Sequence, residues 1–216
     1  MILAPGCEIL IATHNPGKIR EVQEALHPLP VKLRYLSEFP NVSSVNEVGQ
    51  TYEENAVLKA LGYAGQTGLY ALADDSGLEV DSLGGKPGLF SARFGGEHAS
   101  DRDRIQRLLA ALARRGSSER AARFVCCMAL AGWQPSQDPG DRGDPRLLTV
   151  AEARCEGAVA SQPKGANGFG FDPVFVPAGY LATFAELPPE VKARISHRAQ
   201  ALAEIRAFLD QPPAET

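Results

Sequence analysis

A short polar segment near the amino terminus has residue types that suit an anionic oxygen cluster. The segment is Thr13-His14-Asn15-Pro16-Gly17-Lys18, and it joins an apolar run to an amphipathic one, as a turn between a strand and a helix would. Unpaired N–H groups at the helix start, with hydroxyl, amide and ammonium donors, would bind a phosphate. The segment is not a Walker loop of the Gly-Lys-Ser/Thr type, and an Asn-Pro turn with a solvated lysine explains it equally well.

Carboxylates that suit a hard cation follow later in the chain. Two stand in Asp74-Asp75-Ser76-Gly77 at the expected end of a strand, where neighbouring side chains point to opposite faces, so that usually only one faces a given site. Because Mg²⁺ takes one or two carboxylates, several waters and substrate phosphates, Glu47 is a candidate second ligand, with Glu53 and Glu54 as lesser ones. An Asx turn explains the Asp-Asp-Ser-Gly segment equally well.

An aromatic, glycine-rich segment could hold a flat heterocycle. Phe169-Gly170-Phe171-Asp172 ends a stretch in which small residues let a ligand approach the backbone and a ring can stack on a base. A place in the hydrophobic core is the alternative for either ring, and it is favoured for Phe171. Lys192 and the run Ser196-His197-Arg198 add donors for a carbonyl oxygen and a ring nitrogen of a purine, although a single histidine is more often structural than a ligand.

The elements expected around these segments indicate an α/β protein. Apolar runs predict strands over residues 8–13 and 31–36, and apolar residues at helical spacing predict a helix over 18–26 between them. A strand, a helix and a strand in this order favour an α/β fold over an all-α or all-β one.

Two N-terminal capping signals predict further helices. Thr51-x-x-Glu54 caps a helix over 52–64, and Ser100-x-x-Asp103 caps one that ends in the basic run 114–116. The residues expected on the inner side of the first of these helices are Val57, Leu58, Leu61 and Ala64.

The later elements expected from the sequence are mostly strands. They are 70–73, which the turn at 74–77 breaks, then 78–80, 123–131 and 147–160, followed by a closing helix over 199–209. Loops are expected over 84–96 and 134–145, and residues 211–216 are expected to fray.

Composition is typical of an acidic, folded protein. The chain has 22 Lys+Arg against 26 Asp+Glu and a net charge of −4, so no basic surface indicates a nucleic-acid partner. Its 216 residues, 44% of them hydrophobic, suffice for a single domain over 1–216 with two lobes. The longest apolar stretches fall short of the roughly 20 residues that cross a bilayer, so no membrane is expected. The adjacent cysteines at 126–127 predict buried thiols in a reducing cytoplasm.

Five segments in a fixed order resemble one known family. They are ATHNPGK, TYEENAVLKA, ADDSGLEVDSLGGKPGLFSARF, GFGFDP and ISHRAQAL, and they extend over nearly the full length. Together they resemble the Ham1/RdgB-type inosine triphosphate pyrophosphatases, whereas any one of them alone is a weak signal. The resemblance implies an elongated mixed α/β fold with a sheet flanked by helices, two lobes with a central cleft, and a homodimer. It also implies hydrolysis of ITP, dITP and XTP to the monophosphate and pyrophosphate with Mg²⁺, for which Mn²⁺ would substitute.

The resemblance also implies roles for individual residues. The turn from Thr13 to Lys18 would bind the phosphate chain, helped by Lys59 and Ser76. Asp75 matches the residue assigned as general base and metal ligand, Glu47 matches a second metal-binding carboxylate, and Asp74 is an accessory. The residues that match the nucleobase pocket are Phe169, Gly170, Phe171, Asp172, Lys192, Ser196, His197 and Arg198.

The sequence leaves two other functions open. One is a Mg²⁺-dependent pyrophosphatase that acts on another modified or canonical nucleotide. The other is a nucleotide-binding module without turnover, which is disfavoured because Asp75, Glu47, Lys18 and Lys59 are all present. The departures from the family pattern are His14 and Pro16, at variable positions, and an expanded loop over 134–145.

Overall fold

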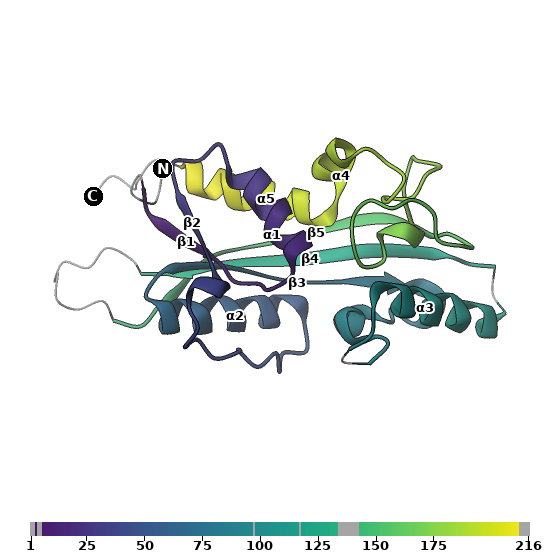
Figure 1. The fold of residues 1–216 in the computed structure, drawn as a ribbon, viewed down its shortest axis with the longest axis horizontal. Coiled ribbons are helices and arrows are strands. Elements are labelled where there is room, and N and C mark those ends of the chain that lie inside the picture. The colour runs from purple at the N-terminus through teal and green to yellow at the C-terminus, as the bar shows by residue number, and fades with distance from the viewer. Residues whose placement is uncertain (1–2, 4–5, 97, 117, 134–142, 212–216) are drawn as a thin grey trace. The chain divides into compact units, whose positions relative to one another are not determined.

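The computed structural model describes the chain except for residues 1–2, 4–5, 97, 117, 134–142 and 212–216 (Figure 1). It divides into two compact units. The first unit comprises Met1–Asp75, Cys127–Glu152 and Ala201–Thr216, and the second comprises Ser76–Cys126 and Ala153–Gln200. Most of the loop expected over 134–145 and the fraying expected over 211–216 lie outside the described residues.

The strands form one mixed sheet in the order β2-β1-β3-β4-β5-β6. Their bounds are Glu8–Ile11 for β1, Lys32–Tyr35 for β2, Tyr70–Val80 for β3, Ala121–Gly132 for β4, Arg146–Val159 for β5 and Phe175–Pro177 for β6. β1 pairs in parallel with β2 and with β3, whereas β5 and β6 are antiparallel. The predicted mixed α/β class with helices flanking a sheet is therefore confirmed.

The first unit is built around the predicted strand–helix–strand arrangement. β1 is a nearly continuous apolar strand, as is typical of a parallel strand covered on both faces. Its neighbours β2 and β3 lie on opposite sides of it, so right-handed crossovers place α1 (Pro16–Leu26) and α2 (Tyr52–Thr67) on opposite faces of the sheet (Figure 1). The start of α1 precedes the predicted one by two residues because proline is well suited to the first helical position.

Helix α2 begins at the predicted cap, but it ends three residues later than predicted and its buried side matches the prediction only in part. Thr51 caps its first turn, and Gly68, with φ 70°, ends it. Leu58, expected inward, is 37% exposed. Ala64 is buried as predicted, and the rest of the buried side is formed by tyrosines and by small and polar residues, which are Tyr52, Asn55, Ala56, Lys59, Ala60 and Tyr63. Alanines let the helix approach the sheet closely, and the two polar residues are buried because they meet a carboxylate on β3.

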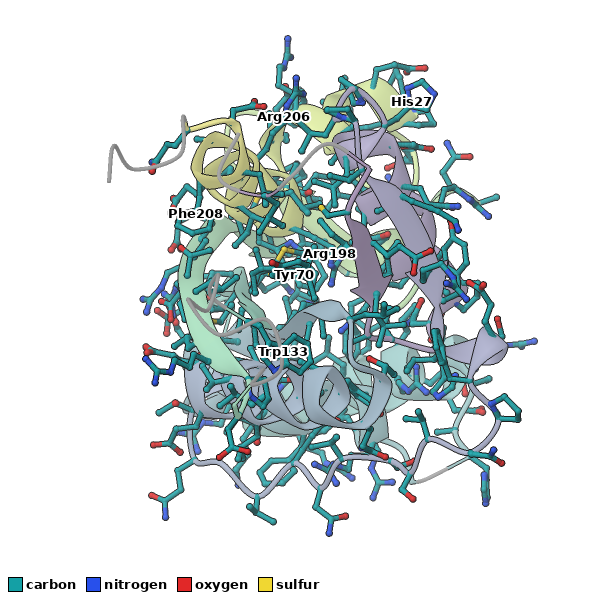
Figure 2. All side chains as sticks on the ribbon, turned by 90° about the vertical axis from the view of Figure 1, so that its left-hand side faces the viewer. His27, Tyr70, Trp133, Arg198, Arg206 and Phe208 are labelled. Atoms are coloured by element: carbon teal, nitrogen blue, oxygen red, sulfur yellow. The ribbon has the colours of Figure 1, made fainter. Side chains whose placement is uncertain are left out.

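Strand β3 is continuous where the sequence predicts a turn. Residues 74–77 lie inside it, so the predicted break between 70–73 and 78–80 is wrong. The local turn preference of Asp-Asp-Ser-Gly is overridden because Asp74 and Asp75 are both buried and both face lysines. At the start of β3, the Tyr70 hydroxyl donates a hydrogen bond of 3.2 Å to the Trp133 carbonyl, and Gly132 leaves room for the tyrosine ring (Figure 2).

The second unit has a core formed by aromatic and aliphatic side chains. Helix α3 (Asp101–Arg115) contributes Ile105, Leu108 and Leu112, which pack with Phe124 and Phe175 among others. Two short 3₁₀ helices follow β3: Asp81–Leu83 precedes the irregular loop expected over 84–96, and Gly88–Arg93 lies inside it.

The carboxyl-terminal region contains two helices and a short strand. Helix α4 (Pro189–Ile195) and strand β6 have no counterpart in the sequence prediction, and α5 (His197–Asp210) begins two residues before the predicted closing helix. Among the described residues, no helix combines the length and the apolar character that crossing a bilayer would require.

The four cysteines are free, and three of them are buried. Burial raises the pKa of Cys127 to about 12 and that of Cys155 to about 11, and it also raises the pKa of the half-buried Cys7. A thiol with a raised pKa is mostly protonated at neutral pH, so its nucleophilicity is low.

We expect the native protein to expose at most one reactive thiol. In a titration with Ellman's reagent at a pH of about 8, only Cys7 should react, because the other three are buried, while all four should react after denaturation in urea. Rapid reaction of two or more thiols in the native protein would contradict the burial of Cys126, Cys127 and Cys155.

Candidate active site

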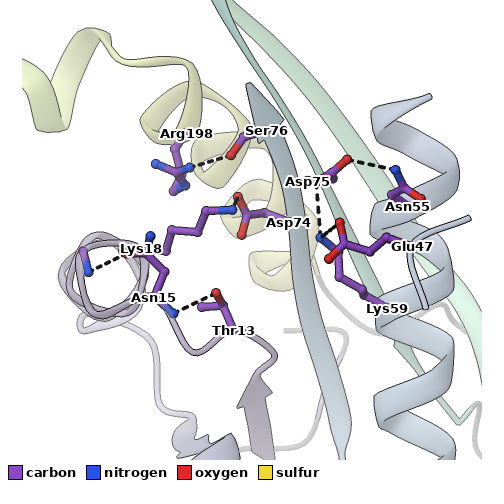
Figure 3. A network of polar contacts seen from close by, with 11 residues as sticks. Thr13, Asn15, Lys18, Glu47, Asn55, Lys59, Asp74, Asp75, Ser76 and Arg198 are labelled. Carbon is purple, nitrogen blue, oxygen red and sulfur yellow. Dashed lines mark hydrogen bonds and ion pairs between the residues drawn. The ribbon is translucent and has the colours of Figure 1, made fainter. Parts of the chain in front are cut away.

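The centre of the candidate site is the carboxylate of Asp75 on β3. Its side chain is 10% exposed; one oxygen lies 3.3 Å from Lys59 Nζ, and the other accepts a hydrogen bond of 3.2 Å from Asn55 Nδ2 (Figure 3). Asn55 and Lys59 are four residues apart on α2, so both point from the same side of that helix. Lys59 Nζ also lies 3.5 Å from Glu47 Oε2, which comes from the loop before α2.

Burial and charge set the proton affinities of this group. Burial raises the pKa of Asp75, and the negative charge of Glu47 raises it further, against the opposing charge of Lys59. Burial alone would lower the pKa of Lys59, but the carboxylates of Asp75, Asp74 and Glu47 together raise it. Lys59 is therefore a cation, and Asp75 is a stronger proton acceptor than an ordinary aspartate.

Asp74 has a different partner from Asp75. Its Oδ2 lies 2.8 Å from Lys18 Nζ, and Figure 3 shows Asp74 directed to Lys18 and Asp75 directed to α2. Adjacent side chains of a strand point to opposite faces, as expected from the sequence. Asp74 thus positions the lysine of the amino-terminal turn.

The amino-terminal turn is organised by its own side chains. Asn15 Oδ1 accepts hydrogen bonds from the N–H groups of Gly17 and Lys18, at 2.9 and 3.2 Å, and Thr13 Oγ1 accepts one from Asn15 N at 3.2 Å. The expectation that the first helical N–H groups are unpaired is therefore wrong for Gly17 and Lys18. An anion at this turn would instead be bound by side chains; His14 and Pro16 are exposed there.

A divalent cation would find few protein ligands here. Across the described ranges, no group of three or more His, Cys, Asp or Glu side chains is arranged to hold a metal ion. Glu47 and Asp75 both approach the same ammonium group, so two carboxylates come close to one position. Two hard oxygen donors fit Mg²⁺, which keeps several waters and takes further oxygens from phosphates. The lesser candidate Glu54 instead accepts a hydrogen bond from Gln50 N at 2.6 Å.

The second unit contains the predicted nucleobase residues, and Asp172 organises them. Asp172 is 2% exposed, its Oδ2 accepts a hydrogen bond of 2.8 Å from Phe169 N, and the same atom is paired with Lys192 Nζ. Gly168 has φ +75°, and a Cβ there would lie 2.0 Å from that oxygen, so the position requires glycine. The backbone before Phe169 is therefore fixed.

The two phenylalanines of this segment have different environments. Phe171 is buried in the core of the second unit, which confirms the alternative favoured from the sequence and argues against a place for this ring in the base pocket. Phe169 is partly exposed, with Lys192 Nζ 4.5 Å and Arg198 Cζ 5.6 Å from its ring centroid. Phe169 is therefore the ring that a flat heterocycle could reach.

The run from Ser196 to Arg198 is buried and structurally engaged. Ser196 Oγ accepts a hydrogen bond from Ala199 N at 3.1 Å in the first turn of α5, and the His197 ring stacks on Phe124 with centroids 4.6 Å apart. Arg198 Nη2 donates to Ser76 Oγ at 2.8 Å (Figure 3). Ser76, predicted to help bind the phosphate chain, therefore contacts a residue of the predicted nucleobase pocket.

Two residues that contact predicted site residues were not themselves predicted from the sequence. Asn55 holds Asp75, and its position four residues before Lys59 is the signal that could have found it. Asp101, the first residue of α3, accepts a hydrogen bond of 2.6 Å from Gly170 N. No local pattern connects residues that are so far apart in the chain.

The fold and these charged groups are typical of an α/β protein that binds a phosphorylated ligand. The chain belongs to the Ham1 family, whose sequence model matches residues 9–208. It is 48% identical over 205 residues to a dITP/XTP pyrophosphatase of Syntrophobacter fumaroxidans, with 94% of this chain and 82% of that protein covered. A dITP/XTP pyrophosphatase of Coxiella burnetii is 42% identical over 94% of this chain and 97% of its own length. The solved structure of a HAM1 protein from Coxiella burnetii has a TM-score of 0.80 and 42% identity, covering 94% of this chain and 98% of that chain.

The buried pair of Asp172 and Lys192 should stabilise the second unit measurably. We expect Asp172→Ala to lower the free energy of unfolding by about 3–5 kcal/mol, because Lys192 would remain buried without its counter-ion. Asp210→Ala is the control, since Asp210 belongs to an exposed pair with Arg206 and should change this free energy by less than about 1 kcal/mol. Equal effects of the two substitutions in urea unfolding would contradict this role of the buried pair.

Proposed function

We propose that the protein hydrolyses dITP, ITP and XTP to the nucleoside monophosphate and pyrophosphate, which removes non-canonical purine nucleotides from the pool. The observation that carries the proposal is the buried Asp75 carboxylate, held by Lys59 and Asn55 beside Glu47, in a chain of the Ham1 family. The names of the relatives from Syntrophobacter fumaroxidans and Coxiella burnetii support the same reaction.

In the proposed reaction, water attacks the α-phosphorus and the bond from this atom to the bridging oxygen breaks. The oxygen of the water bonds to phosphorus, and pyrophosphate leaves with the bridging oxygen. Asp75 accepts the proton of the water, for which its raised pKa suits it. Lys18 and Lys59 neutralise charge on the phosphate chain, together with the donors of the turn from Thr13 to Lys18.

We propose that Glu47 and Asp75 hold a Mg²⁺ ion, for which Mn²⁺ would substitute. The two carboxylates near Lys59 Nζ supply the hard donors, and Asp74 acts through Lys18 instead. When bound, the ion neutralises negative charge that develops on the phosphate oxygens.

Hydrogen bonding would select the base. A 6-oxo purine has acceptors at O6 and N7, whereas adenine has an amino donor in place of the first. Lys192 and Arg198 beside the Phe169 ring carry donors only, so they match the oxo group and not the amino group.

The family resemblance further supports a homodimer, and the free cysteines support a protein that acts in a reducing cytoplasm.

The substrate range is tested by the release of pyrophosphate from dITP, XTP, dGTP and dATP. We expect kcat/KM for dITP and XTP to exceed that for dATP by roughly 10⁴, because adenine would leave buried donors unpaired. Chelation with EDTA should abolish turnover, and added Mg²⁺ or Mn²⁺ should restore it. Equal efficiency on all substrates would remove the specificity claim, and absence of turnover would leave the non-catalytic binding module.

Asp75→Asn tests the assignment of the base. We expect kcat to fall by about 10² to 10⁴-fold, since the amide cannot accept the proton, while the circular dichroism spectrum stays unchanged. Asp81→Asn is a matched control on an exposed carboxylate of the second unit and should leave kcat within about twofold. Near-normal turnover of Asp75→Asn would show that another group is the base.

A further inference from the structure

The carboxylate of Asp101 joins the start of α3 to the segment that carries Phe169. Asp101 Oδ2 accepts a hydrogen bond of 2.6 Å from Gly170 N, and Oδ1 lies 2.6 Å from Arg104 Nη1 one turn along the same helix. Hydrogen bonds to an ionised acceptor are roughly twice as strong as neutral ones. The ion pair with Arg104 also limits the rotation of the carboxylate, so its second oxygen stays directed at Gly170.

Two neighbouring N–H groups are therefore bound by two carboxylates from different parts of the second unit. Asp172 accepts from Phe169 N, and Asp101 accepts from Gly170 N. These N–H groups flank the Cα atom of Phe169. Because the side-chain direction follows from the backbone on both sides of Cα, the pair of contacts sets where the Phe169 ring points.

The two anchors differ in their surroundings. Asp172 is buried and paired with Lys192, whereas the Asp101 side chain is 45% exposed. Gly170 itself has φ +62°, a conformation that glycine adopts with little strain and that leaves the backbone free to rearrange once a restraint is lost. Asp101 is therefore the partly exposed anchor of the backbone at residues 169–170, whereas Asp172 is its buried anchor.

We propose that Asp101 is a positioning residue for the nucleobase, which acts by holding Gly170 N and so orienting the Phe169 ring on which the base stacks. This inference rests on the proposed function, which places the base at Phe169. Asp101 has no described contact with the residues proposed to bind the phosphates or to accept the proton. It should contribute equally to binding in the ground state and in the transition state, and its loss should raise KM with little change in kcat.

A purely structural role of Asp101 is the rival explanation, because an acidic residue in the first turn also stabilises a helix. Asp103 provides the matched control. It lies in the same turn of α3 and forms the capping box with Ser100, and it has no hydrogen bond to the segment at 169–172 among the contacts described. Asp103→Ala should lower the melting temperature without an effect on the base.

The experiment compares Asp101→Ala, Asp101→Asn and Asp103→Ala in the full chain. The readouts are KM and kcat for dITP, the Kd of dIMP by calorimetry, and amide hydrogen exchange at Gly170. For Asp101→Ala we expect KM and Kd to rise about tenfold, kcat to stay within about twofold, and Gly170 to exchange at least about tenfold faster. Asp101→Asn keeps an oxygen that can accept from Gly170 N and should recover most of the affinity. Asp103→Ala should leave KM, Kd and exchange at Gly170 near those of the unmodified protein.

Each contrary outcome has a distinct meaning. If Asp101→Ala and Asp103→Ala change KM and Kd to the same extent, or if Asp101→Ala changes neither, the positioning role is overturned. If the unmodified protein binds dIMP but does not hydrolyse dITP, the proposed function fails, while the Kd values still decide the role of Asp101. If the unmodified protein does not bind dIMP, both fail.

Discussion

The burial of the Asp75 carboxylate against the Lys59 ammonium is the interaction on which the first unit depends. An ionised carboxylate without a partner in such surroundings would be destabilising by several kcal/mol, so the strand and the helix that carry the pair must keep their positions. Helix α2 meets this requirement with Asn55 and Lys59 one turn apart and with alanines that allow close packing. The same burial raises the pKa of Asp75, which gives the carboxylate its strength as a proton acceptor.

The second unit also contains a buried ion pair, and its carboxylate fixes part of the backbone. Asp172 and Lys192 are both buried and paired, and the carboxylate also fixes the backbone of Phe169. Arg198 is 2% exposed and is tied to Ser76. These charged groups are oriented before any ligand arrives, and preorganised groups of this kind lose little free energy to rearrangement when they bind. Across both units, buried charges are therefore paired and held in fixed positions by the residues packed around them.

The sequence predicted those features that have local causes. Caps and helical spacing located the starts of α1, α2 and α3 to within two residues, and the five ordered segments indicated the family that the match over residues 9–208 confirms. The continuity of β3 could not be predicted, because the turn preference of Asp-Asp-Ser-Gly is local whereas Lys18 and Lys59 come from distant helices. The inward position of Leu58 on α2 was mispredicted for a related reason, since the polar residues Asn55 and Lys59 are buried instead because they contact Asp75.

The residues of the candidate site were predicted by type more readily than by contact. Asp75, Lys59 and Glu47 are together in the structure, and Phe169 lies beside Lys192 and Arg198, but the capping of α1 by Asn15 and the contact of Asp101 with Gly170 depend on geometry that residue types do not encode. The different directions of Asp74 and Asp75 were predicted from the alternation of side chains along a strand. Their partners, Lys18 and Lys59, were not predicted.

The roles proposed for Asp75 and Glu47 are best tested by a crystal structure of the protein with Mg²⁺ and a dITP analogue whose bond from the α-phosphorus cannot be hydrolysed. We expect Glu47 and Asp75 to bind the metal ion, Lys59 to contact a phosphate oxygen, and the hypoxanthine ring to stack on Phe169. A complex in which the metal ion binds other residues while Asp75 stays paired with Lys59 and Asn55 alone would contradict these roles.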